Sequence, residues 1–302
     1  MITMSQILGK QITSLTEHDL EGAVNIGKGV FYKAALTSVA LPDSVIHIGE
    51  NAFYACKIVD LKLPSHIKSI GNSAFTSLQM KTLKVPGTLE SLGSLQGDLY
   101  TYVDTSELSP ECSIDVNSFG MASPWFKSLG VPQVIANGKI LLGFRGTTDW
   151  SESIPKTVVT LAQASLQYGW VGSTSYYLES FVIPDHIRYI QSDVFSYQEK
   201  IAKIVIGSNV SKMSSHLVPD TNPTAPINTL VFRQPSDLVV DLPTPGEDTG
   251  LAYAKSSRSV TIYTDNESIK NYNWSGDNIT ATFKPLSEAP TITTAVAPAS
   301  SS

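Results

Sequence analysis

Histidine is the residue type in this chain that could most readily bind a metal ion or transfer protons. The chain contains five histidines, which are His18, His47, His66, His186 and His216. No two of them are spaced as His-x-x-x-His, the usual spacing of a helical metal site. His66 and His186 each stand two residues after a proline, in a position that Ser44 occupies in another copy of the same pattern. The pattern therefore predicts exposed turn positions and no metal site.

A nucleophile or an acid–base pair would be the next requirement for catalysis. A nucleophilic serine needs a sharp elbow such as Gly-x-Ser-x-Gly, and no such motif occurs. Asp43, Glu50 and Asp185 fall in expected turns, and no glycine-rich phosphate loop is present. A carboxylate pair for glycoside hydrolysis stays an open alternative, because its spacing is spatial rather than sequential. We expect a protein that is not an enzyme and takes no cofactor.

Binding residues are easier to propose than catalytic ones. Four aromatic residues lie in a segment that interrupts the regular pattern of the chain, namely Tyr168, Trp170, Tyr176 and Tyr177. Exposed aromatic rings suit glycan stacking or a protein interface, and packing onto the parent fold is the alternative. Lys62 and Lys84 point outward from expected strands. They could solvate a strand edge or form a weak basic stripe for an acidic polymer.

Composition excludes several classes of protein. The net charge is −6 and charged residues make up 16% of the 302 residues, which argues against a nucleic-acid binder. No apolar run reaches the ~18 residues of a membrane span, so we expect no membrane insertion. Cys56 and Cys112 fit no metal or redox spacing and are expected to be buried fillers. The first ten residues do not resemble a secretory signal, although a signal could have been removed.

A repeat of 22 residues organises the chain. The same residue types recur from Leu41 to Leu63, Pro42 to Pro64, Ile48 to Ile70, Gly49 to Gly71 and Phe53 to Phe75. A fixed period in the twenties predicts a solenoid, whose coils bury their apolar sides against each other. The Leu-x-Leu segment predicts a short strand that the proline ends, and the glycine predicts a tight bend or a positive φ. The expected core ladder consists of Phe31, Phe53, Phe75, Phe119 and Phe195.

The period divides the chain into segments. Residues 1–22 are expected to cap the solenoid, and residues 23–285 to form it. The pattern is irregular at 97–150, where Asn137-Gly138 predicts a hairpin, and at 167–178, which is expected to be an inserted loop. Residues 286–302 are rich in Ala, Ser, Thr and Pro, and taken alone this tail is expected to be disordered.

The unit Leu-Pro-x-x-Val-x-x-Ile-Gly-x-x-Ala-Phe stands nearly unaltered at 41–53 and 63–75. It resembles the repeat of BspA-like leucine-rich-repeat proteins, and the similarity extends over residues 12–283. The resemblance implies a mainly β, right-handed solenoid with short strands, single-turn helices, a hairpin insertion and capped ends. It also implies surface recognition without a shared catalytic site. The opening segment 11–22 resembles the phage-encoded members of this family.

From this resemblance we expect a bacteriophage virion component that decorates the particle or attaches it to the host surface. The alternatives are a bacterial cell-surface adhesin module and an intracellular protein-interaction scaffold. The expected partners are other virion proteins or a glycan or protein of the host surface, and a homo-oligomer stays open. The expected location is the virion, with the cell surface as the alternative.

Overall fold

The computed structural model describes residues 12–96, 99–115, 117–144, 154–167, 169–171, 174–217, 227–247 and 249–298. These residues form mainly short strands with a few helical turns, which confirms the expected solenoid. Two compact units make up the chain. Unit 1 contains residues 1–130 and 135–137, and unit 2 contains residues 131–134 and 138–302.

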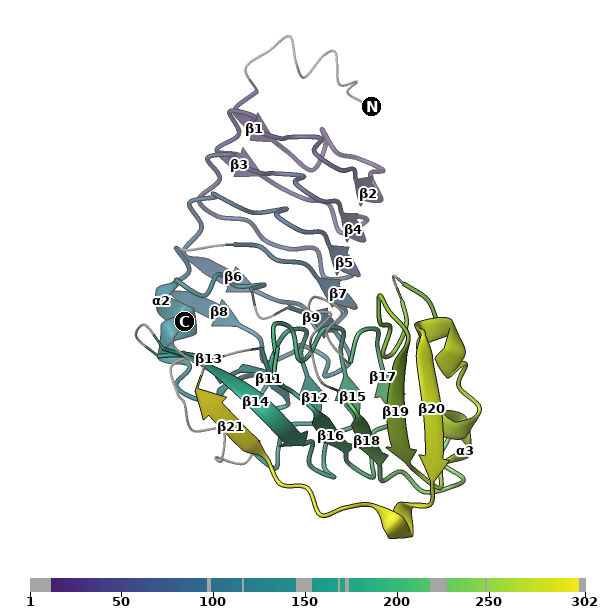
Figure 1. Ribbon diagram of the computed structural model, residues 1–302. Coiled ribbons are helices and arrows are strands. Elements are labelled where there is room, and N and C mark those ends of the chain that lie inside the picture. The colour runs from purple at the N-terminus through teal and green to yellow at the C-terminus, as the bar shows by residue number, and fades with distance from the viewer. Residues whose placement is uncertain are drawn as a thin grey trace. The chain divides into compact units, whose positions relative to one another are not determined.

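Unit 1 is a stack of coils that contribute short strands to two rows (Figure 1). The first row contains β1 (Ser14–Leu15), β3 (Ser38–Val39), β6 (Thr82–Lys84) and β8 (Tyr102–Asp104). The second row is a parallel sheet of β2 (Asn25–Ile26), β4 (His47–Ile48), β5 (Ser69–Ile70), β7 (Ser91–Leu92) and β9 (Ser113–Ile114). Neighbours in this sheet pair with an offset of 22 residues, as in Ile48 with Ile70. The repeat period therefore sets the register of the strands.

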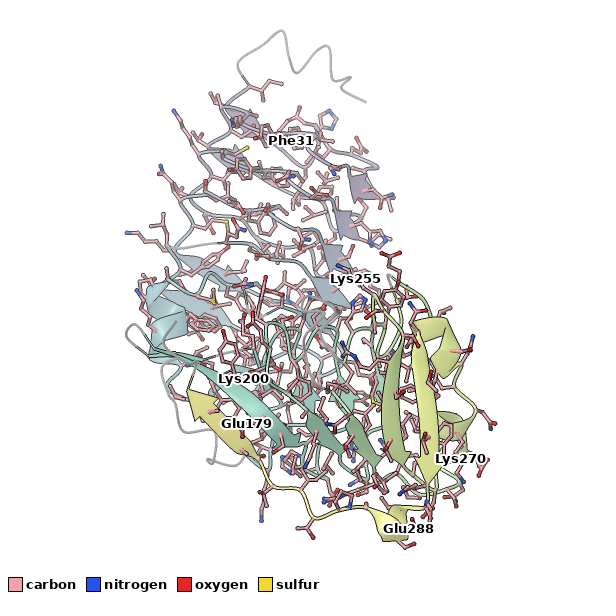
Figure 2. The ribbon with its side chains drawn as sticks, in the orientation of Figure 1. Phe31, Glu179, Lys200, Lys255, Lys270 and Glu288 are labelled. Atoms are coloured by element: carbon pink, nitrogen blue, oxygen red, sulfur yellow. The ribbon has the colours of Figure 1, made fainter. Side chains whose placement is uncertain are left out.

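Phenylalanine rings fill the coils of unit 1. The rings of Phe31 and Phe53 stack with centroids 5.2 Å apart, and Phe53 and Phe75 follow at 6.2 Å (Figure 2 labels Phe31). Phe119 instead meets Trp125 edge to face at 5.0 Å. Trp125 lies in the short helix α2 (Pro124–Ser128). Each pair adds about 0.5–1.5 kcal/mol beyond the burial of its area.

The repeat glycines are required for a different reason from the one the sequence suggests. Gly49 and Gly71 do not adopt a positive φ, which occurs two residues later at Asn51 and Ser73. A Cβ on Gly71 would lie 2.5 Å from the backbone nitrogen of Glu50 in the preceding coil. Glycine is therefore needed because adjacent coils approach each other closely at this point.

Unit 2 contains two sheets, and a turn precedes the first full strand of the unit. Residues 136–139 form a turn between β10 (Gln133–Ile135) and β11 (Ile140–Gly143), which are neighbouring strands, at the site of the expected hairpin. One sheet continues from β11 through β12 (Thr160–Leu161), β15 (Tyr189–Ile190) and β17 (Lys212–Met213). The other contains β13 (Gly169–Val171), β14 (Thr174–Val182), β16 (Lys203–Ile206), β18 (Thr229–Phe232), β19 (Arg258–Tyr263) and β20 (Ile279–Lys284). The inward residues of both sheets form one apolar core.

The inserted segment is not the loop that the sequence predicts. β13 and β14 pair antiparallel, with Gly169 opposite Tyr176 and Val171 opposite Thr174. β14 then continues into the parallel sheet, where Phe181 pairs with Ile204 of β16. The strand-forming residues of β14 extend an existing sheet, and this pairing favours a strand over a loop.

Residues 286–298 of the C-terminal tail are ordered, whereas the composition of the tail taken alone predicts disorder. Leu286–Glu288 forms the short helix η2, and Ala295–Pro298 forms the strand β21. β21 pairs antiparallel with β14, from Tyr176 opposite Pro298 to Ser180 opposite Ala295 (Figure 1). Backbone pairing with a distant strand supplies the order that the tail's own composition does not provide.

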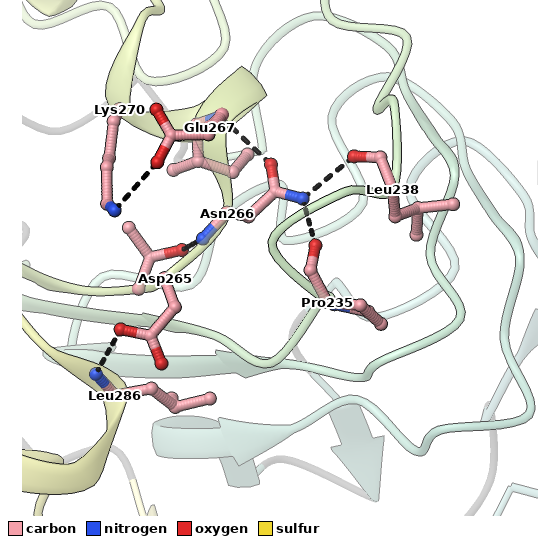
Figure 3. A network of polar contacts seen from close by, with 9 residues as sticks. Pro235, Leu238, Asp265, Asn266, Glu267, Lys270 and Leu286 are labelled. Carbon is pink, nitrogen blue, oxygen red and sulfur yellow. Dashed lines mark hydrogen bonds and ion pairs between the residues drawn. The ribbon is translucent and has the colours of Figure 1, made fainter.

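A buried asparagine, Asn266, connects the loop between β18 and β19 to the helix that follows β19. Asn266 caps α3 (Glu267–Lys270) by accepting a hydrogen bond from Ile269 N at 3.2 Å. Its Nδ2 donates to the carbonyl oxygens of Pro235 at 2.6 Å and Leu238 at 2.8 Å (Figure 3). One side chain thus satisfies three backbone groups, one at the start of the helix and two in the loop.

Candidate binding surface

The sheet β2–β4–β5–β7–β9 of unit 1 presents a continuous row of polar side chains. The second residue of each strand is buried, so the first residue must face outward. The outward residues, which we call the polar row, are Asn25, His47, Ser69, Ser91 and Ser113. His47 Nδ1 and Ser69 Oγ lie 2.8 Å apart, within hydrogen-bond distance. The coils therefore repeat hydroxyl, amide or imidazole groups at the ~4.8 Å strand spacing.

Ion pairs between adjacent coils flank the polar row. Lys28 Nζ lies 2.9 Å from Glu50 Oε2, and Lys68 Nζ lies 2.6 Å from Glu90 Oε1. All four side chains are well exposed, so each pair adds little to stability. Their effect is to balance the charge beside the row, which leaves a surface suited to hydrogen bonding rather than to strong electrostatic attraction.

Residues that follow β7 and β9 in the sequence line a shallow depression on the surface of unit 1. Its volume is about 560 Å³, within the range of small-molecule sites. The lining residues are Ser94, Gln96, Asn117, Gly120, Met121, Ala122 and Lys127. Lys127 is the one charged residue among them and comes from α2. The depression can therefore offer hydroxyl, amide and ammonium groups to a small polar ligand.

The two lysines singled out in the sequence have different surroundings, and a basic stripe through them stays a proposal. Lys62 is exposed, and Lys84 lies in β6 with its Nζ 2.7 Å from Glu107 Oε1. The hydrogen bond with Glu107 and the charge of that carboxylate raise the pKa of Lys84. Nearby, the hydroxyl of Ser106 lowers the pKa of Asp104. Acidic neighbours thus balance the positive charge of Lys84.

The structure describes the side chain of only one of the four aromatic residues of the insertion, Tyr177. Tyr168 lies outside the described residues, and the side chains of Trp170 and Tyr176 lie outside them as well, although their backbones belong to β13 and β14. Tyr177 is half-buried, and Lys200 Nζ lies 5.6 Å from the centroid of its ring. A role in recognition for these residues stays a proposal.

Both cysteine thiols of the chain are buried and carry no disulfide. Burial raises the pKa of Cys56 to about 11 and that of Cys112 to about 12, which keeps both thiols protonated and unreactive at neutral pH. Among the described residues, no three His, Cys, Asp or Glu side chains gather as metal ligands would. No helix within that part of the chain is long and apolar enough to cross a membrane.

Sequence reasoning missed the polar row because its residue type varies from coil to coil. The available signal was positional: each row residue directly precedes the buried Ile or Leu of the repeat, as in His47-Ile48-Gly49 and Ser69-Ile70-Gly71. A motif defined by fixed residue types cannot reveal such a surface.

The repeat of this chain matches that of a known family. Six copies of the BspA type leucine rich repeat region match residues 12–122 and 171–229. No curated protein matches the chain. A leucine-rich repeat protein from Bacteroides ovatus is 16% identical with a TM-score of 0.37, over 91% of this chain and 73% of that one.

Two further solved structures are similar at the same low level. The pneumococcal vaccine antigen PcpA is 15% identical with a TM-score of 0.33, over 91% of this chain and 78% of that one. A leucine rich cell surface protein from Faecalibacterium prausnitzii is 17% identical with a TM-score of 0.26, over 90% and 88% of the two chains. The repeat model, in contrast, matches more than half of the 302 residues. The chain therefore belongs to the BspA type leucine-rich-repeat family.

Proposed function

We propose that this protein is a non-catalytic binding module whose polar row contacts a glycan of a host surface. The observation that supports the proposal is the in-register row of five outward polar side chains from Asn25 to Ser113. A polysaccharide is itself a repeating array of hydroxyl groups, so successive sugars can meet successive coils with the same chemistry.

Repetition is what makes such a surface useful. A hydrogen bond at an exposed site contributes only about 0.5–1.5 kcal/mol, because water competes for both partners. One coil is therefore too weak to hold a sugar. A chain of linked sugars can contact several coils together. Its overall affinity is higher than that of a single sugar, because the second and later contacts form within an existing complex. The ligand class favoured is consequently a polymer rather than a single small molecule.

The depression, which is lined by residues that follow β7 and β9, supports a preference for an acidic sugar. Lys127 supplies an ammonium group, and Gln96 and Asn117 supply amides, within the same 560 Å³ space. A carboxylate on a terminal sugar would pair with the ammonium and leave its hydroxyl groups for the amides. In this proposal the row holds the glycan chain and the depression holds its charged end.

Removing the polar row is expected to weaken glycan binding about tenfold. The triple variant His47→Ala, Ser69→Ala and Ser91→Ala deletes three successive contacts, each of about 0.5 kcal/mol. Binding is measured on an array of bacterial and host-surface polysaccharides, followed by titration of the best ligand. A Trp170→Ala variant in the same titration tests whether the insertion adds a contact.

The matched control changes the other row of unit 1. Ser38 and Thr82 are outward, exposed hydroxyl residues of β3 and β6. Their double replacement by alanine is expected to leave the affinity unchanged. Equal affinities for the triple variant and the wild-type protein would exclude the polar row as the site. Failure of the wild-type protein to retain any polysaccharide would reject a glycan as the partner.

For the place of action we propose the bacteriophage particle, with the bacterial cell surface as the alternative. The support is the resemblance of segment 11–22 to phage-encoded members of the family. Immunogold labelling distinguishes the two places, because the antibody would decorate purified particles in the first case and bacterial cells in the second. Labelling of neither would favour the intracellular scaffold.

A further inference from the structure

β14 has partners on both of its edges in unit 2. Ser180 pairs with Lys203 of β16 on one side and with Ala295 of β21 on the other. The tail strand thus covers a sheet edge, which would otherwise present unpaired N–H and C=O groups to any extended chain. Leu178 of this strand is fully buried, so the edge lies directly beside the core.

The tail is held on this edge by its backbone more than by its side chains. None of residues 285–297 is buried, and Val296 is the tail residue that packs against the core. Ser180 Oγ donates to the carbonyl oxygen of Thr293 at 2.6 Å, and Val182 N donates to Thr294 Oγ1 at 3.2 Å. These contacts require only an extended chain of small residues, and they would be the same whichever molecule supplied it.

The connection to the tail is long and weakly attached. From β20 the chain crosses past β18 and β16 to reach β14 (Figure 1). Along this path Leu286 N donates to Asp265 Oδ1 at 3.2 Å (Figure 3). The cost of ordering these residues opposes the pairing, because the large apolar residues of the crossing, Leu286 and Ile292, are only partly buried. An element of this kind opens more easily than the sheet it covers.

We propose that the β14 edge is a strand-addition site that accepts residues 289–298 from a second copy of this chain. In the monomer the tail pairs with β14 of its own chain, which we call the closed form. Two copies that exchange their tails keep every contact of the closed form. The dimer is disfavoured only because its tail and β14 belong to different molecules. Exchange is therefore driven by protein concentration. A crowded assembly of identical copies would link its members through this strand.

Cysteines placed across the strand pair distinguish exchange from closure. Tyr177 pairs with Ala297, so the full-length Tyr177→Cys, Ala297→Cys variant can form one disulfide at this position. The native thiols of Cys56 and Cys112 are buried and do not compete. The variant is incubated at low or high concentration, oxidised with copper phenanthroline and separated on a denaturing gel without reductant. We expect linked monomers at low concentration and linked dimers at high concentration.

Single variants provide the control, because Tyr177→Cys alone or Ala297→Cys alone can form dimers only by collision. Linked monomers at every concentration would overturn the proposal. A second measurement applies if the double variant does not fold. A fluorescent peptide of residues 285–302 is added to the wild-type protein, where we expect a rise in polarisation that the Val296→Pro peptide does not produce. Equal binding of the two peptides, or binding of neither, would also overturn strand addition.

Discussion

Replacing Gly71 by alanine is expected to lower the free energy of unfolding of unit 1 by about 3 kcal/mol, the upper part of the usual range for overpacking. The added methyl would lie 2.5 Å from Glu50 N and 2.8 Å from Gly49 C. Both atoms belong to the backbone of the preceding coil and cannot rotate away. The coils must separate, which weakens the 2.8 Å bond from Gly71 N to the carbonyl oxygen of Ile48.

Differential scanning calorimetry of the full chain measures this effect, and a fall of about 10 °C in the transition of unit 1 is expected. Gly27→Ala is the matched control, since Gly27 occupies the same repeat position 22 residues before Gly49. Its Cβ would meet the side chain of Val30 at 3.2 Å, and that side chain can move. We expect a loss under about 1 kcal/mol there. If the two variants were equally stable, close approach of the coils would not be the reason for glycine.

Replacing Asp277 by alanine is expected to destabilise unit 2 by about 4 kcal/mol, because several buried donors lose their acceptor together. Asp277 is fully buried. Its Oδ1 accepts from Gly246 N at 3.0 Å, and its Oδ2 accepts from Ala252 N at 3.0 Å and from the hydroxyl of Tyr272 at 2.9 Å. The carboxylate thereby connects the proline-rich loop after β18 to the helix η1 (Trp274–Asp277).

The nearly isosteric variant makes this prediction specific. Both carboxylate oxygens accept hydrogen bonds, so the amide nitrogen of Asp277→Asn would face a donor in either orientation. We expect Asp277→Asn to be almost as unstable as Asp277→Ala. Tyr272→Phe removes one of the donors and should cost less, about 1–2 kcal/mol. Urea unfolding of the three variants gives the order, and a stable Asp277→Asn protein would contradict the role assigned to the carboxylate.

Local sequence determines most of unit 1. The 22-residue period predicts the coils, and the structure pairs His47 with Ser69 and Ile48 with Ile70 at that offset. The repeated Ile directs its own side chain inward and its neighbour outward, because successive residues of a strand face opposite sides. The polar row follows from this alternation, although its residue types differ from coil to coil and form no recognisable motif.

Contacts between distant segments decided the rest. β14 is a strand because β16 and β21 pair with it, and the tail is ordered because the β14 edge, more than 100 residues earlier, needs a partner. Gly71 is selected by the coil before it rather than by its own φ. The pattern of buried residues is present within each repeat, so the sequence alone determined the solenoid. Backbone pairing and close approach depend on which segments meet, so only the tertiary structure could decide them.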